Sequence, residues 1–260
     1  ACAQIYTKIC LWCSMMPMLL ALLVLCYIVL SLRPQFESLL YVALLLHVSS
    51  VGYMLVDVTW TDPMLGLSFV GWLLAAIAVL ISKQDKLSAL VSPMLGVVSV
   101  MLTLAMLAPV SSNSPMEVQV WVGLHVALIL LGYLGCLGSG LLGAVYIFVQ
   151  HKLKEKSLKT VVRYPSLSVL ERYHTSGVWL GVIGLFTGVT AGIVWGINQT
   201  TLVFDITTIS SLLLLAWYGA SLIGRILGRS ARWSAWMSSL GLGVLTVYFF
   251  LSAVIGSWHM

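Results

Sequence analysis

Three histidines that lie in or beside apolar runs are the residues of this sequence best suited to chemistry. His47 falls in the middle of a hydrophobic run, His125 about one turn inside the start of another, and His259 at the end of the last. A titratable group inside a membrane span is costly to place, so each histidine is a functional candidate. Because an imidazole can ligate iron, and bundles hold haem between facing helices, we interpret His125 and His259 as candidate axial ligands of a haem iron. His47 is a candidate for an entry or second-site ligand.

Each of these residues also has an ordinary structural interpretation. His125 is equally compatible with a hydrogen-bonded core histidine, and His259 with a penultimate residue at the membrane surface. Between them in the sequence lie Trp195 and the pair Phe204-Asp205. Aromatic residues at this level commonly form an interfacial belt, but a flat aromatic shelf would also suit a porphyrin plane. Both interpretations remain open from the residues alone.

The elements that must position these residues are membrane-spanning helices. The chain has 260 residues, of which 60% are hydrophobic and only 8% charged, with a mean hydropathy of +1.05. Soluble domains carry about 25% charged residues, and about 20 apolar residues are needed to cross the hydrocarbon as a helix. We therefore predict an all-α, polytopic membrane bundle that forms a single integral membrane domain over residues 16–260. The eight predicted spans are 12–32, 38–56, 64–82, 87–108, 121–149, 177–197, 206–227 and 236–258.

The charged residues between the spans predict the orientation. Twelve of the thirteen Lys and Arg residues fall in alternate gaps, the exception being Lys8, and the other gaps contain acids only. Lysine and arginine collect in cytoplasmic loops, so we expect both termini on the outer face of a bacterial inner membrane. The net charge of +5 is then explained by anionic lipid rather than by nucleic acid. Residues 1–15 are interpreted as a possible N-terminal extension.

The longest predicted cytoplasmic loop, 151–176, holds six cations between Lys152 and Arg172. Such a loop is a topology signal in contact with lipid, or alternatively a docking site for a cytoplasmic partner. In the sixth span, Gly184, Gly188, Gly192 and Gly196 recur every four residues, which places them along one helix ridge. A glycine ridge permits close helix packing, or clears a groove for a bulky ligand.

The order of several short motifs resembles the cytochrome c assembly family of membrane proteins, most closely its HemX-like and YpjD-like branch. The motifs that carry the resemblance are Trp121-Val122-Gly123-Leu124-His125-Val126, Leu131-Gly132-Tyr133, Tyr146, Gln150, Leu153-Lys154, Leu46-His47-Val48, Leu67-Ser68, Gly71-Trp72, Pro165-Ser166-Leu167, Leu170-Glu171-Arg172 and Trp217-Tyr218. The resemblance implies a protein that handles haem at the outer face and delivers it to apocytochrome c or another assembly subunit. It also implies that His125 and His259 flank the haem, and that Asp205 ends the segment that is tryptophan-rich in the family.

Two departures from the family pattern bear on the activity. The segment from Trp195 to Asp205 holds one tryptophan where several are expected, and Gly224-Arg225 stands where the family has a later histidine. They favour a haem-handling protein that is at most a component of a haem-lyase system, with no catalytic residue of its own. The alternative is a non-catalytic scaffold or regulator of tetrapyrrole metabolism that acts through residues Lys152 to Arg172. A transporter or hydrolase is disfavoured, because no mid-span charge or nucleophile–base pair is present.

Overall fold

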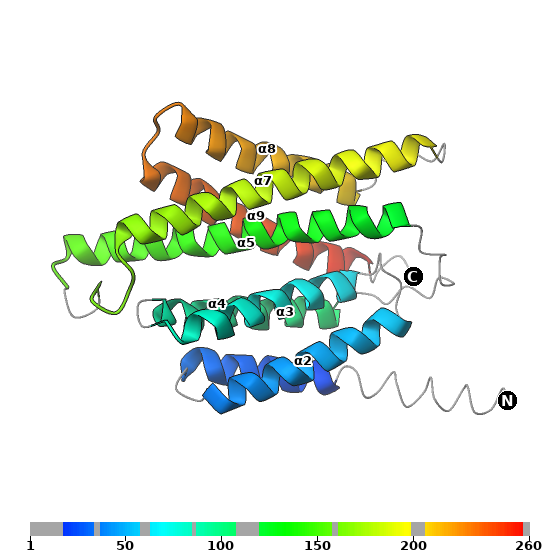
Figure 1. Ribbon diagram of the computed structural model, residues 1–260, viewed down its shortest axis with the longest axis horizontal. Coiled ribbons are helices and arrows are strands. Elements are labelled where there is room, and N and C mark those ends of the chain that lie inside the picture. Colours follow the sequence, from blue (N-terminus) through cyan, green and yellow to red (C-terminus); the bar gives the residue numbers. More distant parts are fainter. Residues whose placement is uncertain are drawn as a thin grey trace. The chain divides into compact units, whose positions relative to one another are not determined.

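The computed structural model describes residues 18–33, 37–57, 63–84, 87–107, 120–157, 161–198 and 206–256. These residues form eight long α-helices and one short 3-10 helix, with no strand among them (Figure 1). The elements are Met18–Leu32, α2 (Glu37–Asp57), α3 (Pro63–Ser82), η1 (Ser88–Leu90), α4 (Val91–Leu107), α5 (Val120–Lys154), α7 (Leu167–Asn198), α8 (Ile206–Ile226) and α9 (Ala231–Gly256). The all-α prediction and the eight helices are confirmed.

Five of these helices are long and apolar enough to cross a membrane. The five spans are Met64–Ser82, Ser88–Leu107, Gly123–Lys154, Leu167–Ile197 and Ile209–Ile226, and Met18–Leu32 and Ser38–Met54 are shorter apolar helices. Their backbone groups are paired within each helix, as a hydrocarbon environment requires. The chain is therefore a multi-pass membrane protein.

The chain divides into two compact units. The first comprises residues 1–84, 90–115 and 252–260, and the second comprises residues 85–89 and 116–251. In the first unit, the helix Met18–Leu32 packs with α2, α3 and α4 around buried side chains that include Leu23, Met54 and Leu95. The Ser92 hydroxyl donates a hydrogen bond to the Ser31 carbonyl oxygen, which ties the start of α4 to the end of the first helix.

In the second unit, α5 and α7 lie side by side along most of their length (Figure 1). Glycines make this approach possible. A Cβ atom added to Gly135 would lie 2.3 Å from the Gly181 nitrogen, and one added to Gly184 would lie 2.6 Å from the Gly132 nitrogen. The predicted glycine ridge is therefore a close helix contact at Gly184 and Gly188.

Helix α7 begins at Leu167, ten residues before the predicted start at Gly177. The prediction was wrong because residues 171–176 are polar, and a search for apolar runs stops at them. Ser166 precedes the helix, and its carbonyl oxygen accepts the first helical bond, from the Leu170 nitrogen at 3.0 Å. At 1.5 Å per residue, α5 and α7 are about 52 and 48 Å long, which exceeds the ~30 Å of hydrocarbon. Both helices are therefore longer than a span perpendicular to the membrane requires.

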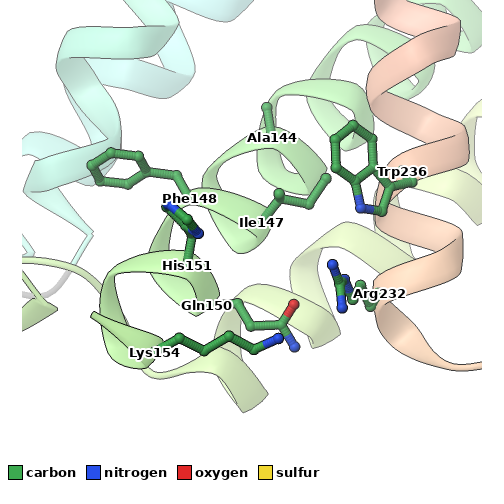
Figure 2. Close-up of a pocket in the computed structure, with 8 residues that line it drawn as sticks. All are labelled: Ala144, Ile147, Phe148, Gln150, His151, Lys154, Arg232 and Trp236. Carbon is green, nitrogen blue, oxygen red and sulfur yellow. The ribbon is translucent and has the colours of Figure 1, made fainter. Parts of the chain in front are cut away.

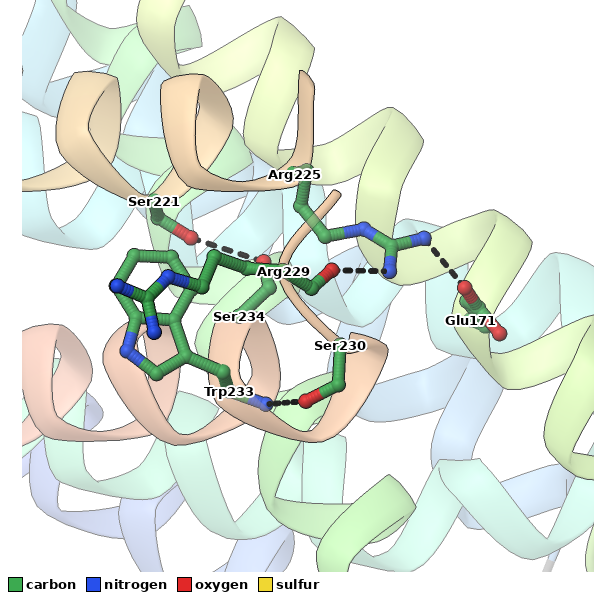
Figure 3. Close-up of polar contacts among 7 residues, drawn as sticks. All are labelled: Glu171, Ser221, Arg225, Arg229, Ser230, Trp233 and Ser234. Carbon is green, nitrogen blue, oxygen red and sulfur yellow. Dashed lines mark hydrogen bonds and ion pairs between the residues drawn. The ribbon is translucent and has the colours of Figure 1, made fainter. Parts of the chain in front are cut away.

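The turn between α8 and α9 is determined by local residues. Gly228 has a φ of 83°, and the Arg229 nitrogen donates to the Gly224 carbonyl oxygen at 2.9 Å. This pattern is a Schellman motif, in which glycine takes the left-handed position without steric cost. Ser230 caps α9, because its hydroxyl oxygen accepts from the Trp233 nitrogen at 3.3 Å (Figure 3).

Candidate haem-ligating site

The His125 side chain lies between α5 and α7 and is partly buried. Its Nδ1 atom lies 2.7 Å from the Gly188 carbonyl oxygen. A carbonyl oxygen can only accept, so Nδ1 carries the proton and donates. In a neutral imidazole the lone pair then resides on Nε2, the nitrogen that remains available for a metal. Among the residues that the structure describes, none forms a hydrogen bond to His125 Nε2.

Gly192, one turn along α7 from Gly188, gives the imidazole its space. A Cβ atom at Gly192 would lie 2.6 Å from His125 Cε1 and 2.7 Å from Nδ1, so any larger residue would displace the ring. At Gly188 an added Cβ would lie 2.9 Å from the Ile129 nitrogen, which keeps α5 and α7 close beside the histidine. The glycine ridge therefore both packs the helices and orients the His125 ring.

The other residues predicted at the outer face are only partly described. Trp195 follows Gly192 by three residues on α7 and is half-buried, so it lies on the same side of the helix as the His125 contact. Phe204, Asp205 and His259 lie outside the described residues. The structure thus places His125 and Trp195 on neighbouring helices, and the rest of the proposed site stays a prediction.

His47 is located in the first unit, on α2, and is completely enclosed. Its Nδ1 atom lies 3.2 Å from the Tyr27 hydroxyl oxygen, and its Nε2 atom lies 3.3 Å from the Ser68 hydroxyl oxygen. His47 and Ser68 are both 0% exposed, as is Tyr27. Both ring nitrogens are therefore engaged, which is the arrangement of a hydrogen-bonded core histidine. A metal ion could reach His47 only if one of these bonds were broken.

An ion pair joins α7 to α8 where the family pattern has a later histidine. The Arg225 guanidinium donates to the Glu171 carboxylate through Nη2 and to the Arg229 carbonyl oxygen through Nη1, at 3.3 Å for the latter (Figure 3). Beside it, a Cβ atom on Gly224 would lie 2.2 Å from the Trp233 ring. Gly224 and Arg225, which depart from the family pattern, therefore contact the neighbouring helices: Arg225 contacts α7 and Gly224 contacts α9.

A buried polar cluster in the same unit was missed by sequence reasoning. His174 Nε2 lies 3.1 Å from the Ser238 hydroxyl oxygen, and the Tyr218 hydroxyl donates to the carbonyl oxygens of Cys136 at 3.0 Å and Ser238 at 3.1 Å. His174 is 3% exposed, although it falls within the segment 151–176 that the sequence analysis predicted to be a cytoplasmic loop. The sequence did contain a signal for this: Pro165-Ser166 is a typical helix start, and a helix beginning there would have included His174.

The predicted basic segment, Lys152 to Arg172, comprises the end of α5, the connection that follows it and the start of α7. Glu155 accepts hydrogen bonds from Lys152 Nζ at 2.7 Å and from His151 Nε2 at 2.9 Å. The Lys152 hydrogen bond and charge, with His151, hold the pKa of Glu155 below its usual range. Glu155 therefore stays ionised at neutral pH, while Lys156, Arg163 and Arg172 are exposed.

The fold and the site define a class: an all-helical, multi-pass membrane protein with a partly buried histidine at the start of a long span. The sequence matches the family described as Cytochrome C assembly protein over residues 13–259, and the chain belongs to that family. No curated protein and no solved structure matches the chain. The predicted membership of the cytochrome c assembly family is therefore confirmed.

Proposed function

We propose that this protein binds haem near the outer membrane face and presents it for cytochrome c biogenesis, with His125 as an axial ligand. The observation that carries the proposal is the hydrogen bond from His125 Nδ1 to the Gly188 carbonyl oxygen, 2.7 Å long. Metal-ligating histidines typically donate their other N–H to a carboxylate or a backbone carbonyl, which fixes the tautomer and the ring orientation. Membership of the family supports the same role.

In this proposal each residue has a limited task. His125 offers the Nε2 lone pair, Gly188 orients the ring, and Gly192 leaves room for it. Trp195 and Phe204 would supply a shelf for the porphyrin, while Asp205 and His259 complete the outer side, His259 as the second axial ligand. Bound haem would supply the iron and the porphyrin that apocytochrome c or another assembly subunit receives. His47 would be a second-site ligand only after release from Tyr27 or Ser68.

The proposed orientation follows from the charge pattern. The connected ends of α5 and α7, with Lys152, Lys154 and Arg172, would face the cytoplasm, and the His125 end would face outward. Single cysteines placed at Lys156 and at Gln199 test it, in a background without the native cysteines, by labelling right-side-out vesicles with an impermeant maleimide. We expect labelling at 199 alone. Labelling at 156 alone would reverse the topology and exclude haem presentation at the outer face.

The absorption spectrum of the protein purified after expression with added haem precursor tests the function. We expect a Soret band in the wild-type protein and a loss of at least tenfold in bound haem for His125→Ala. His174→Ala is the matched control, because His174 is a buried histidine of the same unit that is bonded to Ser238. A band of unchanged height in His125→Ala would exclude His125 as a ligand.

The second candidate is the HemX-like alternative, a regulator that acts through the segment from Lys152 to Arg172 without binding haem. The Glu171–Arg225 ion pair, at the position of an expected family histidine, favours it. The same spectrum separates the two candidates: a wild-type protein without a Soret band would support the regulator and exclude haem presentation.

A further inference from the structure

A pocket lies between the last turns of α5 and the first turns of α9, far along α5 from His125. It has a volume of about 370 Å³ and is lined by Ala144, Ile147, Phe148, Gln150, His151, Lys154, Arg232 and Trp236 (Figure 2). Close contacts fix the two helices here: a Cβ on Gly143 would lie 2.7 Å from the Ala235 carbonyl oxygen, and Ser239 Oγ donates to the Gly140 carbonyl oxygen at 3.3 Å. The pocket is therefore held between two fixed helix ends.

One end of the pocket is cationic. Gln150, Lys154 and Arg232 all line the pocket, and Figure 2 draws their polar ends in the same part of the view. Within the described part of the chain, neither Lys154 nor Arg232 has an ion-pair partner, and the nearby acid Glu155 already binds His151 and Lys152. These side chains present several N–H donors and two uncompensated charges, a set that suits the oxygens of a phosphate group.

The other end of the pocket is apolar. Ile147 and Ala144 lie about two and three turns further into α5 than Lys154, and Phe148 and Trp236 flank them (Figure 2). Phe148 is 41% exposed and Trp236 is 46% exposed. Exposed aromatic rings next to cations at the end of a span mark the level where hydrocarbon meets headgroups. The apolar end therefore points toward the acyl chains and the cationic end toward the headgroups.

We propose that this pocket binds one anionic phospholipid, with its phosphate held by Lys154, Arg232 and Gln150 and an acyl chain along Ile147 and Trp236. Basic pockets between spanning helices are suited to acidic lipid headgroups. A lipid is favoured over a soluble phosphate compound because the apolar half contributes only if the ligand carries a hydrocarbon chain. The proposal is independent of haem binding.

Native mass spectrometry of the purified full chain tests the proposal. The protein is equilibrated in detergent with equal amounts of phosphatidylglycerol and phosphatidylcholine, and the retained lipids are counted. We expect one retained phosphatidylglycerol per wild-type chain. Each cation near the membrane surface contributes about a fivefold preference for anionic lipid, so Lys154→Gln with Arg232→Gln should weaken retention about 25-fold.

The matched control is Arg163→Gln with Arg172→Gln, which removes two exposed cations from the same end of the unit but none from the pocket. The control should retain the phosphatidylglycerol. Equal losses in both double variants would mean that only diffuse charge attracts the lipid, and would overturn the proposal.

Glycerol 1-phosphate, which has the headgroup chemistry without acyl chains, separates the two possible ligand sources. We expect it to displace the lipid only at a concentration at least 100-fold above that of phosphatidylglycerol, and Trp236→Ala to weaken lipid retention with the charges intact. Displacement at an equal concentration would assign the pocket to a soluble phosphate compound and overturn the lipid assignment.

Discussion

At the scale of single residues, the hydrogen bonds of the two ring nitrogens distinguish the role of His125 from that of His47. His125 donates from Nδ1 to a carbonyl oxygen, and its Nε2 atom has no hydrogen-bond partner among the described residues, whereas both nitrogens of His47 are engaged by hydroxyl groups. Sequence reasoning selected both residues because of their apolar surroundings. It could not distinguish them, because the partner of His125 is Gly188, which is 63 positions away, and that contact depends on which helices pack together.

Gly192→Ala tests whether the orientation of the His125 ring controls haem affinity. The new methyl group would lie 2.6 Å from Cε1, so the ring must shift and its 2.7 Å bond to Gly188 must weaken. Substitutions that disturb the residues orienting a metal ligand commonly cost about 10- to 100-fold in metal affinity, and we expect about tenfold here. Haem titration monitored at the Soret band measures the change.

Gly219→Ala is the control for this substitution, because nothing lies within 4 Å of the added Cβ. Its haem affinity should equal that of the wild-type protein. An unchanged affinity in Gly192→Ala would show that the ring orientation in the structure is unimportant for binding.

At the scale of helices, the length of the apolar runs predicted most helix boundaries well, but it missed helical turns that are made of polar residues. The predicted spans 38–56, 64–82 and 206–227 agree with α2, α3 and α8 to within one residue at each end. Helix α7 was predicted ten residues too short, because Glu171 and His174 lower the hydropathy of its first turns. Those residues are tolerated there because Arg225 and Ser238 satisfy them, and such tertiary partners cannot be read from a hydropathy pattern.

Gly135→Ala tests the close contact between α5 and α7. The added Cβ would lie 2.3 Å from the Gly181 nitrogen and 2.7 Å from its Cα, and this backbone cannot move without separating the helices. Overpacking of this kind costs about 1–3 kcal/mol in the free energy of unfolding. Reversible unfolding in mixed detergent micelles measures the loss.

Gly138→Ala is its matched control on the same helix, three residues away. An added Cβ there meets nothing within 4 Å, so alanine should stabilise α5 by up to about 1 kcal/mol through helix propensity. Equal destabilisation by both substitutions would contradict the α5–α7 contact described above.

At the scale of the whole molecule, the two long helices connect two chemically different levels. The His125 end of α5 carries the proposed haem ligand, and the opposite end, from Phe148 to Lys154, carries cations and the lipid pocket. Composition and charge alternation were sufficient to predict a multi-pass membrane protein. The haem site could be predicted only in part, because its proposed members lie on segments far apart in the chain, and the packing of those segments cannot be read from the sequence.

Imidazole rescue of His125→Gly tests the central claim, haem ligation by His125, most directly. Glycine at position 125 removes the ligand and leaves a space beside Gly192, where free imidazole can take its place. We predict that the purified variant lacks a Soret band, and that millimolar imidazole with haem restores a band at the wild-type position. If His125→Gly retains the wild-type spectrum without imidazole, then His125 does not ligate haem and the account is contradicted.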